Sequence, residues 1–100
     1  MVKPDEIADL FRRIIQGTSD FEWMPSFSWM GRKTTSLQLR CEGYIIDIFV
    51  DVGELDYVDH VIDLDGQRVL FDEKGLTDPL DLLTDDEHKR LIETFENKSN

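Results

Sequence analysis

The residue types that most often act as nucleophiles or general bases are scarce in this chain. It contains two histidines, His60 and His88, and one cysteine, Cys41. Asp59 directly precedes His60, and a carboxylate next to an imidazole can orient a general base. Adjacent residues of a regular strand point to opposite faces, however, so these two side chains are not expected to meet. No phosphate-binding loop, serine nucleophile elbow or HExxH pattern is present. We therefore expect no enzymatic activity and no cofactor.

The nearest match to a metal-binding motif is Asp63-Leu64-Asp65-Gly66. A calcium loop of the EF-hand type needs another acidic or amide residue two positions earlier and a glutamate six positions after the glycine. Those two positions hold Val61 and Asp72. Asp-Gly between two alternating segments is instead a strong hairpin signal. The segment is therefore predicted to be a turn, and no metal site is predicted.

The strongest functional signal is a run of carboxylates without basic residues. Between Arg40 and Arg68 there is no Lys or Arg, and the carboxylates in this run are Glu42, Asp47, Asp51, Glu54, Asp56, Asp59, Asp63 and Asp65. The same run contains the Ile-rich segment Tyr44–Asp51, whereas a disordered acidic tail has too few apolar residues to fold. The sequence therefore predicts a rigid acidic surface, suited to a basic partner or to imitating nucleic acid.

Composition narrows the class of partner further. The chain has 100 residues, of which 40% are hydrophobic, and its formal net charge is -11. Nucleic-acid phosphates and anionic membrane surfaces repel such a chain, so neither is expected to be a direct ligand. No apolar run approaches the about 18 residues of a membrane span, and the first residues do not have the pattern of a signal peptide. We expect one globular domain over residues 1–100, located in the cytoplasm.

A helix is predicted near each end of the chain. Apolar residues recur at helical spacing from Ile7 to Ile15, and Gly17 offers a stop. Thr84–Glu87 has the spacing of a capping box, which would start a second helix with Leu91 and Phe95 on one face.

Between these helices, alternating apolar residues predict an antiparallel meander. The candidate strands are Phe27–Met30, Thr35–Cys41, Tyr44–Asp51, Tyr57–Asp63 and Gln67–Phe71, and residues 18–25 are predicted to be a loop. Short connections favour pairing in sequence order. The expected fold is α+β, with a meander of four or five strands and both terminal helices packed on the sheet. The expected core joins Leu10, Phe11 and Ile14 with Ile46, Ile48, Leu91 and Phe95.

The acidic run is predicted to carry the partner-binding surface. Regular alternation places Asp47 and Asp51 on one face of their strand. On the next strand it places Asp59 and Asp63 on the same face as Tyr57 and Val61. Like charges on neighbouring strands repel one another unless a cation or a basic partner meets them. The residues assigned to partner binding are Asp47, Asp51, Glu54, Asp56, Tyr57, Asp59 and Asp63.

An aromatic and sulfur cluster precedes the acidic run, formed by Trp23, Met24, Phe27, Trp29 and Met30. Two interpretations stay open. The side chains line the core, or they form a patch for a partner or for self-association, because such residues are enriched at interface centres. The oligomeric state is left open with them.

Glu42-Gly43-Tyr44, Asp51, Leu55-Asp56-Tyr57 and Asp65-Gly66 make up a Gly-aromatic strand start, an Asp-x-x-x-Leu-Asp-Tyr stretch and an Asp-Gly turn. This pattern resembles a family of small uncharacterised bacterial domains. Members of that family often carry cysteines in the acidic segment, which this chain lacks there. The family has no established activity, so the resemblance implies no binding residues.

In general character the chain also resembles immunity proteins of bacterial toxin systems, including contact-dependent growth inhibition and the nuclease colicins. That resemblance implies an acidic inhibitor that is steered onto a basic nuclease toxin and blocks its nucleic-acid site. The predicted function is therefore an immunity protein that neutralises such a toxin. Two alternatives stay open: an inhibitor that mimics nucleic acid, as anti-CRISPR proteins do, and a small bacterial domain with another binding function.

Overall fold

In the computed structural model, which describes residues 2–24, 34–51, 54–73 and 75–98, two helices flank a five-stranded antiparallel sheet. The elements are α1 (Pro4–Gln16), β1 (Glu22–Trp23), β2 (Thr34–Cys41), β3 (Tyr44–Asp51), β4 (Glu54–Ile62), β5 (Arg68–Val69), the 3-10 helix η1 (Pro79–Leu82) and α2 (Asp85–Asn97). The strands lie in the order β1-β2-β3-β4-β5. The predicted α+β meander with a helix near each end is confirmed.

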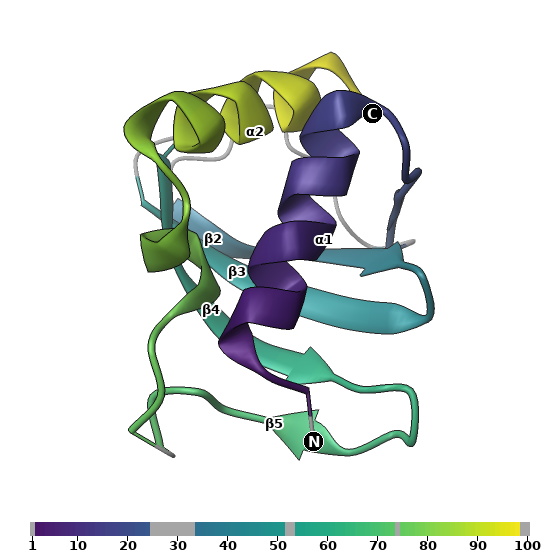
Figure 1. Cartoon of the computed structure of the whole chain (residues 1–100), viewed down its shortest axis with the longest axis vertical. Coiled ribbons are helices and arrows are strands. Elements are labelled where there is room, and N and C mark those ends of the chain that lie inside the picture. The colour runs from purple at the N-terminus through teal and green to yellow at the C-terminus, as the bar shows by residue number, and fades with distance from the viewer. Residues whose placement is uncertain (1, 25–33, 52–53, 74, 99–100) are drawn as a thin grey trace.

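Both helices contribute to one hydrophobic core against the sheet. Figure 1 shows α1 passing across β2, β3 and β4, with α2 crossing near one end of α1. The residues predicted to form the core are all buried in one cluster, namely Leu10, Phe11, Ile14, Ile46, Ile48, Leu91 and Phe95. The predicted core is therefore confirmed.

The predicted capping box starts α2 and also connects it to α1. Thr84 Oγ1 accepts the Glu87 N–H at 3.1 Å, and Glu87 Oε1 accepts the Thr84 N–H at 2.9 Å. Arg12 on α1 donates to Glu87 Oε2 at 2.9 Å and to the Leu82 carbonyl at 2.7 Å. The Thr84 N–H and then the Arg12 guanidinium lower the pKa of Glu87 from its ordinary value. One side chain thus ties α1 to both η1 and α2.

The β2–β3 hairpin turns at Glu42-Gly43, as the sequence predicts. Both residues have positive φ, 51° and 87°, which is the signature of a type I′ turn. Arg13 on α1 binds the Glu42 carboxylate with two nitrogens, at 2.9 and 3.1 Å. Hydrogen bonding from Arg13, and to a smaller extent from Ser19, lowers the pKa of the Glu42 carboxyl from its ordinary value. The turn is therefore fixed to the helix above it.

Several predicted strand boundaries are wrong. Residues 22–23, predicted to be part of a loop, form β1, because Trp23 pairs with Leu39 and packs its ring at 5.3 Å from that of Phe95. β4 begins at Glu54 rather than at Tyr57, and the last strand is reduced to Arg68–Val69. The predicted strand over residues 27–30 lies outside the described residues. Within the described ranges, no helix has the length and apolar character needed to cross a bilayer.

Candidate functional site

β4 carries two more residues than the stretch of β3 that it pairs with. Residues 54–62 oppose residues 45–51, and the register shifts once between Asp47 and Ile48 and again between Phe49 and Val50. The residues of β4 that have no partner in this register are Asp59 and Asp56. Each is a β-bulge, an inserted residue that bends a strand and re-aims its side chains.

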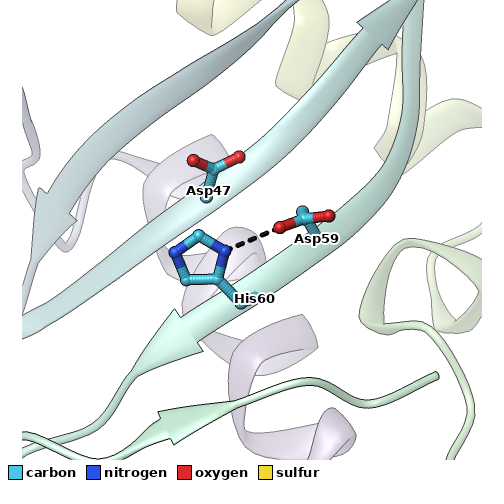
Figure 2. Close-up of side chains that lie close together, drawn as sticks. All are labelled: Asp47, Asp59 and His60. Atoms are coloured by element: carbon cyan, nitrogen blue, oxygen red, sulfur yellow. Dashed lines mark hydrogen bonds and ion pairs between the residues drawn. The ribbon is translucent and has the colours of Figure 1, made fainter. Parts of the chain in front are cut away.

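The bulge at Asp59 overturns the prediction that Asp59 and His60 point to opposite faces. Asp59 Oδ2 and His60 Nδ1 lie 2.7 Å apart. Figure 2 shows both side chains gathered with Asp47, which extends from β3. Side chains alternate strictly between two faces only in a regular strand, and here the inserted residue interrupts that period of two.

The same bulge overturns a second expectation, that Tyr57 and Val61 share a face. Val61 is fully buried in the core, whereas Tyr57 is 42% exposed. The Tyr57 ring stacks on Phe49 with the centroids 5.2 Å apart. Tyr57 therefore lies on the outer face of the sheet, and Val61 lies on the face covered by the helices.

Asp47 is buried although it lies on the outer face of β3. Its exposed fraction is 5%. In the sheet it pairs with Gln38 on β2 and with His60 on β4. Oδ2 accepts a hydrogen bond from Gln38 Nε2 at 2.7 Å. Oδ1 is buried and has no hydrogen-bond partner within the described part of the chain. A buried carboxylate oxygen without a partner is uncommon, because desolvation is then left uncompensated.

Asp47, Asp59 and His60 together bring three possible ligand atoms into one place. One atom from each side chain lies within 4.8 Å of the other two. His60 is half-buried, with 13% of its side chain exposed, whereas 40% of the Asp59 side chain is exposed. The sequence does not predict this cluster. The three side chains meet because of the bulge at Asp59, and that bulge is defined only by how β4 pairs with β3.

A second acidic feature is a cleft of about 620 Å³ beside β4. Tyr57, Val58 and Asp59 of β4 line it together with residues that follow β5: Leu70, Asp72, Glu73, Leu76, Thr77, Asp78 and Asp81. The carboxylates that line the cleft are Asp59, Asp72, Glu73, Asp78 and Asp81. None of the described residues lining it is basic. The run without basic residues does not predict the last four of these carboxylates, because they lie outside it.

Asp78 is a half-buried carboxylate of this cleft. Its two oxygens accept the N–H groups of Val58 and Leu80, each at 2.9 Å. Burial raises the pKa of Asp78 from its ordinary value, and nearby Asp81 and Asp56 reinforce the shift, while the two N–H groups oppose it. A cation entering the cleft would favour the ionised carboxylate and lower that pKa.

Residues 1–97 match the sequence model of a protein family, DUF7693, which is a domain of unknown function. The chain belongs to the DUF7693 family. The predicted membership of a small uncharacterised domain family is thereby confirmed, whereas the resemblance to immunity proteins stays a prediction. No curated protein and no solved structure matches the chain.

The seven residues assigned to partner binding differ in their exposure to solvent in this DUF7693 domain. Asp51, Glu54, Asp56 and Tyr57 are exposed, and Asp59 is half-buried. Asp47 and Asp63 are buried, with exposed fractions of 5% and 7%. Their burial does not fit direct contact with a partner, so the acidic surface available to a partner is formed by the other five and by the cleft.

Asp63 has a structural role in the turn before β5. Its Oδ1 accepts the N–H groups of Asp65 at 3.0 Å and Gln67 at 2.9 Å. We expect Asp63→Ala to destabilise the domain by about 1 kcal/mol, since both donors belong to exposed residues and can be rehydrated. Asp63→Asn keeps an acceptor oxygen and should cost less. Urea denaturation of both variants measures the difference, and equal losses would mean that the charge matters rather than the acceptor.

Cys41 and Trp23 serve the packing of the domain. Cys41 is buried, its Sγ lies 3.1 Å from the Asp20 carbonyl, and burial raises the pKa of the thiol. A reactive cysteine needs a lowered pKa and access to solvent, so this thiol is unreactive. Trp23 packs edge-on against Phe21 and Phe95, which assigns it to the core. Phe27, Trp29 and Met30 of the aromatic cluster lie outside the described residues.

Proposed function

We propose that this DUF7693 domain binds a basic protein through the acidic cleft beside β4 and acts as a cytoplasmic immunity protein against a basic toxin. The observation that supports this most is the charge of the cleft. It is lined by five carboxylates and by no described basic residue, in a chain with a formal net charge of -11. Such a concentration of one sign raises the local concentration and association rate of a positive partner.

The walls of the cleft suit long basic side chains in particular. Tyr57, Val58, Leu70 and Leu76 provide apolar surface between the carboxylates. Lys and Arg bury their methylene stems against such surface while their charged ends meet carboxylates. The exposed ring of Tyr57 also offers a face to a cation. A cleft of about 620 Å³ therefore has the size and chemistry for basic side chains projecting from a partner.

Exposed carboxylates extend the negative field beyond the cleft. Asp51 and Glu54 pair with each other where β3 meets β4, and Asp56 is close enough to Asp78 to raise its pKa. Proteins that cleave nucleic acid carry positive surface to hold phosphates. An inhibitor with this charge distribution is steered to that surface and blocks it, which supports a nuclease toxin as the partner.

Neutralising the exposed carboxylates of the cleft tests the proposal. The variant is Asp72→Asn, Glu73→Gln and Asp81→Asn, and the partner is the basic protein that co-purifies with the wild-type chain from its native host, which we expect to be the toxin. We expect association at low salt to slow by at least about tenfold, because complementary charge acts mainly on the association rate. Stopped-flow mixing at several salt concentrations measures it, and the difference should shrink as salt rises.

The matched control removes three carboxylates elsewhere: Glu22→Gln, Glu93→Gln and Glu96→Gln. Glu22 lies on β1, at the opposite edge of the sheet, and Glu93 and Glu96 are exposed on α2. The control should associate faster than the cleft variant and should still protect cells that express the toxin. If both triple variants bind at the wild-type rate, the cleft is not the contact surface. Failure of the wild-type chain to protect such cells would refute the immunity function.

A further inference from the structure

We propose that Asp47, Asp59 and His60 form a binding site for a divalent transition-metal ion, with Zn²⁺ as the preferred ion. This inference is independent of the proposed immunity function. Asp47 on β3 pairs with His60 on β4, and the inserted residue Asp59 places its carboxylate next to His60 (Figure 2). One atom from each lies within 4.8 Å of the other two. Zn²⁺ binds nitrogen and oxygen at about 2.0–2.2 Å, so small side-chain rotations bring these atoms to ligand distances.

The unpaired oxygen of Asp47 is an independent reason to infer an ion. Asp47 is 5% exposed, and its Oδ1 is buried without a hydrogen-bond partner in the described residues. Burying a carboxylate in this way is unfavourable unless a cation compensates for the lost water. A bound Zn²⁺ would supply that partner. Gln38 Nε2 already holds the other oxygen at 2.7 Å, as the outer hydrogen bonds of metal ligands commonly do.

The contact between Asp59 and His60 fits the same interpretation. Asp59 Oδ2 and His60 Nδ1 share a hydrogen bond of 2.7 Å, so the imidazole nitrogen and the carboxylate oxygen already lie side by side. A metal ion takes the place of the shared proton, because it is bound by the imidazole lone pair and by the carboxylate oxygen. The positive ion also offsets the repulsion between the Asp47 and Asp59 carboxylates.

The kinds of ligand atom indicate which metal is preferred. Ca²⁺ and Mg²⁺ are bound by oxygen, whereas an imidazole nitrogen beside carboxylates suits Zn²⁺ and similar transition metals. The one cysteine, Cys41, pairs with Tyr44 on the β2–β3 hairpin and is not part of the cluster. Three protein ligands would leave a fourth position on Zn²⁺ for water or another group. Asp59 also lines the cleft, so the candidate site lies beside it.

Titration calorimetry with ZnCl₂ tests the site on protein freed of metal by EDTA and carrying no histidine tag. We expect a single ion per chain, and neither MgCl₂ nor CaCl₂ should displace it. His60→Gln and Asp47→Asn should each weaken Zn²⁺ affinity by at least about tenfold. The matched controls are His88→Gln, which changes the other histidine, and Asp56→Asn, which changes the other bulge. Both should stay within about twofold of the wild type, because they are not ligands.

NMR spectra of the histidine side chains show where the ion binds, which the affinities alone do not. The chain has two histidines, so two sets of imidazole resonances are expected, and the His88→Gln variant assigns them. Paramagnetic Mn²⁺ added in small amounts should broaden the His60 signals before those of His88. Unchanged Zn²⁺ affinity in His60→Gln, or equal broadening of both histidines, would overturn the site. Neither result would bear on the toxin test, whose variants change Asp72, Glu73 and Asp81 and none of the three ligands.

Discussion

Truncating Ile48 to alanine should destabilise the domain by about 2–5 kcal/mol, and Leu10→Ala should have an effect of the same size. Both side chains are fully buried in the single core cluster, Ile48 from the central strand β3 and Leu10 from α1. Removing either one loses buried apolar surface and leaves a cavity that the surrounding side chains fill only in part. The free energy of unfolding from urea denaturation, at constant m-value, measures the loss.

Leu64→Ala is the matched control for these truncations. Leu64 is 66% exposed in the turn after β4, so the same change of residue type should cost less than about 0.5 kcal/mol. If Ile48→Ala costs no more than Leu64→Ala, the inner face of β3 has been assigned incorrectly. A reduced m-value in either core variant would instead indicate loss of two-state unfolding.

Local patterns carry enough information to predict most of this fold. The helical spacing of Ile7 to Ile15 and the capping box at Thr84 predict α1 and α2, since both signals depend on residues within a few positions of one another. The turn at Glu42-Gly43 follows from Gly43, which adopts positive φ without strain and stands between two alternating segments. Short turns between alternating segments then determine the order of the strands.

The two bulges of β4 depend on information that local patterns do not contain. Asp56 and Asp59 differ in no obvious way from other carboxylates of the run, and each becomes an inserted residue only relative to its partners on β3. The exposure of Tyr57 and the burial of Val61 both follow from that register. The candidate metal cluster therefore arises from strand pairing, and a prediction based on strict alternation separates its members.

The sequence predicts only the part of the acidic cleft that comes from β4, because the rest of its lining comes from a distant part of the chain. Tyr57 and Asp59 belong to the run that the sequence singles out, but Asp72, Glu73 and Asp81 lie beyond Arg68. They reach β4 because the chain folds back along the sheet edge, where Asp78 accepts the Val58 N–H. The nearest signal in the sequence is Asp78-Pro79, which is typical of the start of a helical turn and here begins η1. That signal predicts the turn without predicting which strand it contacts.

Replacing Asp47 with asparagine should stabilise the metal-free domain by about 1–3 kcal/mol, because it removes a buried carboxylate oxygen that has no hydrogen-bond partner. Asparagine keeps an acceptor for Gln38 Nε2, which now binds Oδ2 at 2.7 Å. Its amide nitrogen can also donate toward Asp59. The substitution nearly conserves volume, so the packing around β3 should be unchanged.

Zinc should reverse this order of stability. An ion that binds only the folded state stabilises it by about 2.7 kcal/mol at a concentration of 100 Kd. The wild-type chain should gain this amount, whereas Asp47→Asn should gain little because it has lost a ligand. Urea denaturation in EDTA and in excess ZnCl₂ measures both effects, with the exposed bulge variant Asp56→Asn as the control that follows the wild type. Destabilisation of Asp47→Asn in EDTA would mean that the ionised carboxylate is compensated within the protein itself, which would remove the main reason for placing an ion beside it.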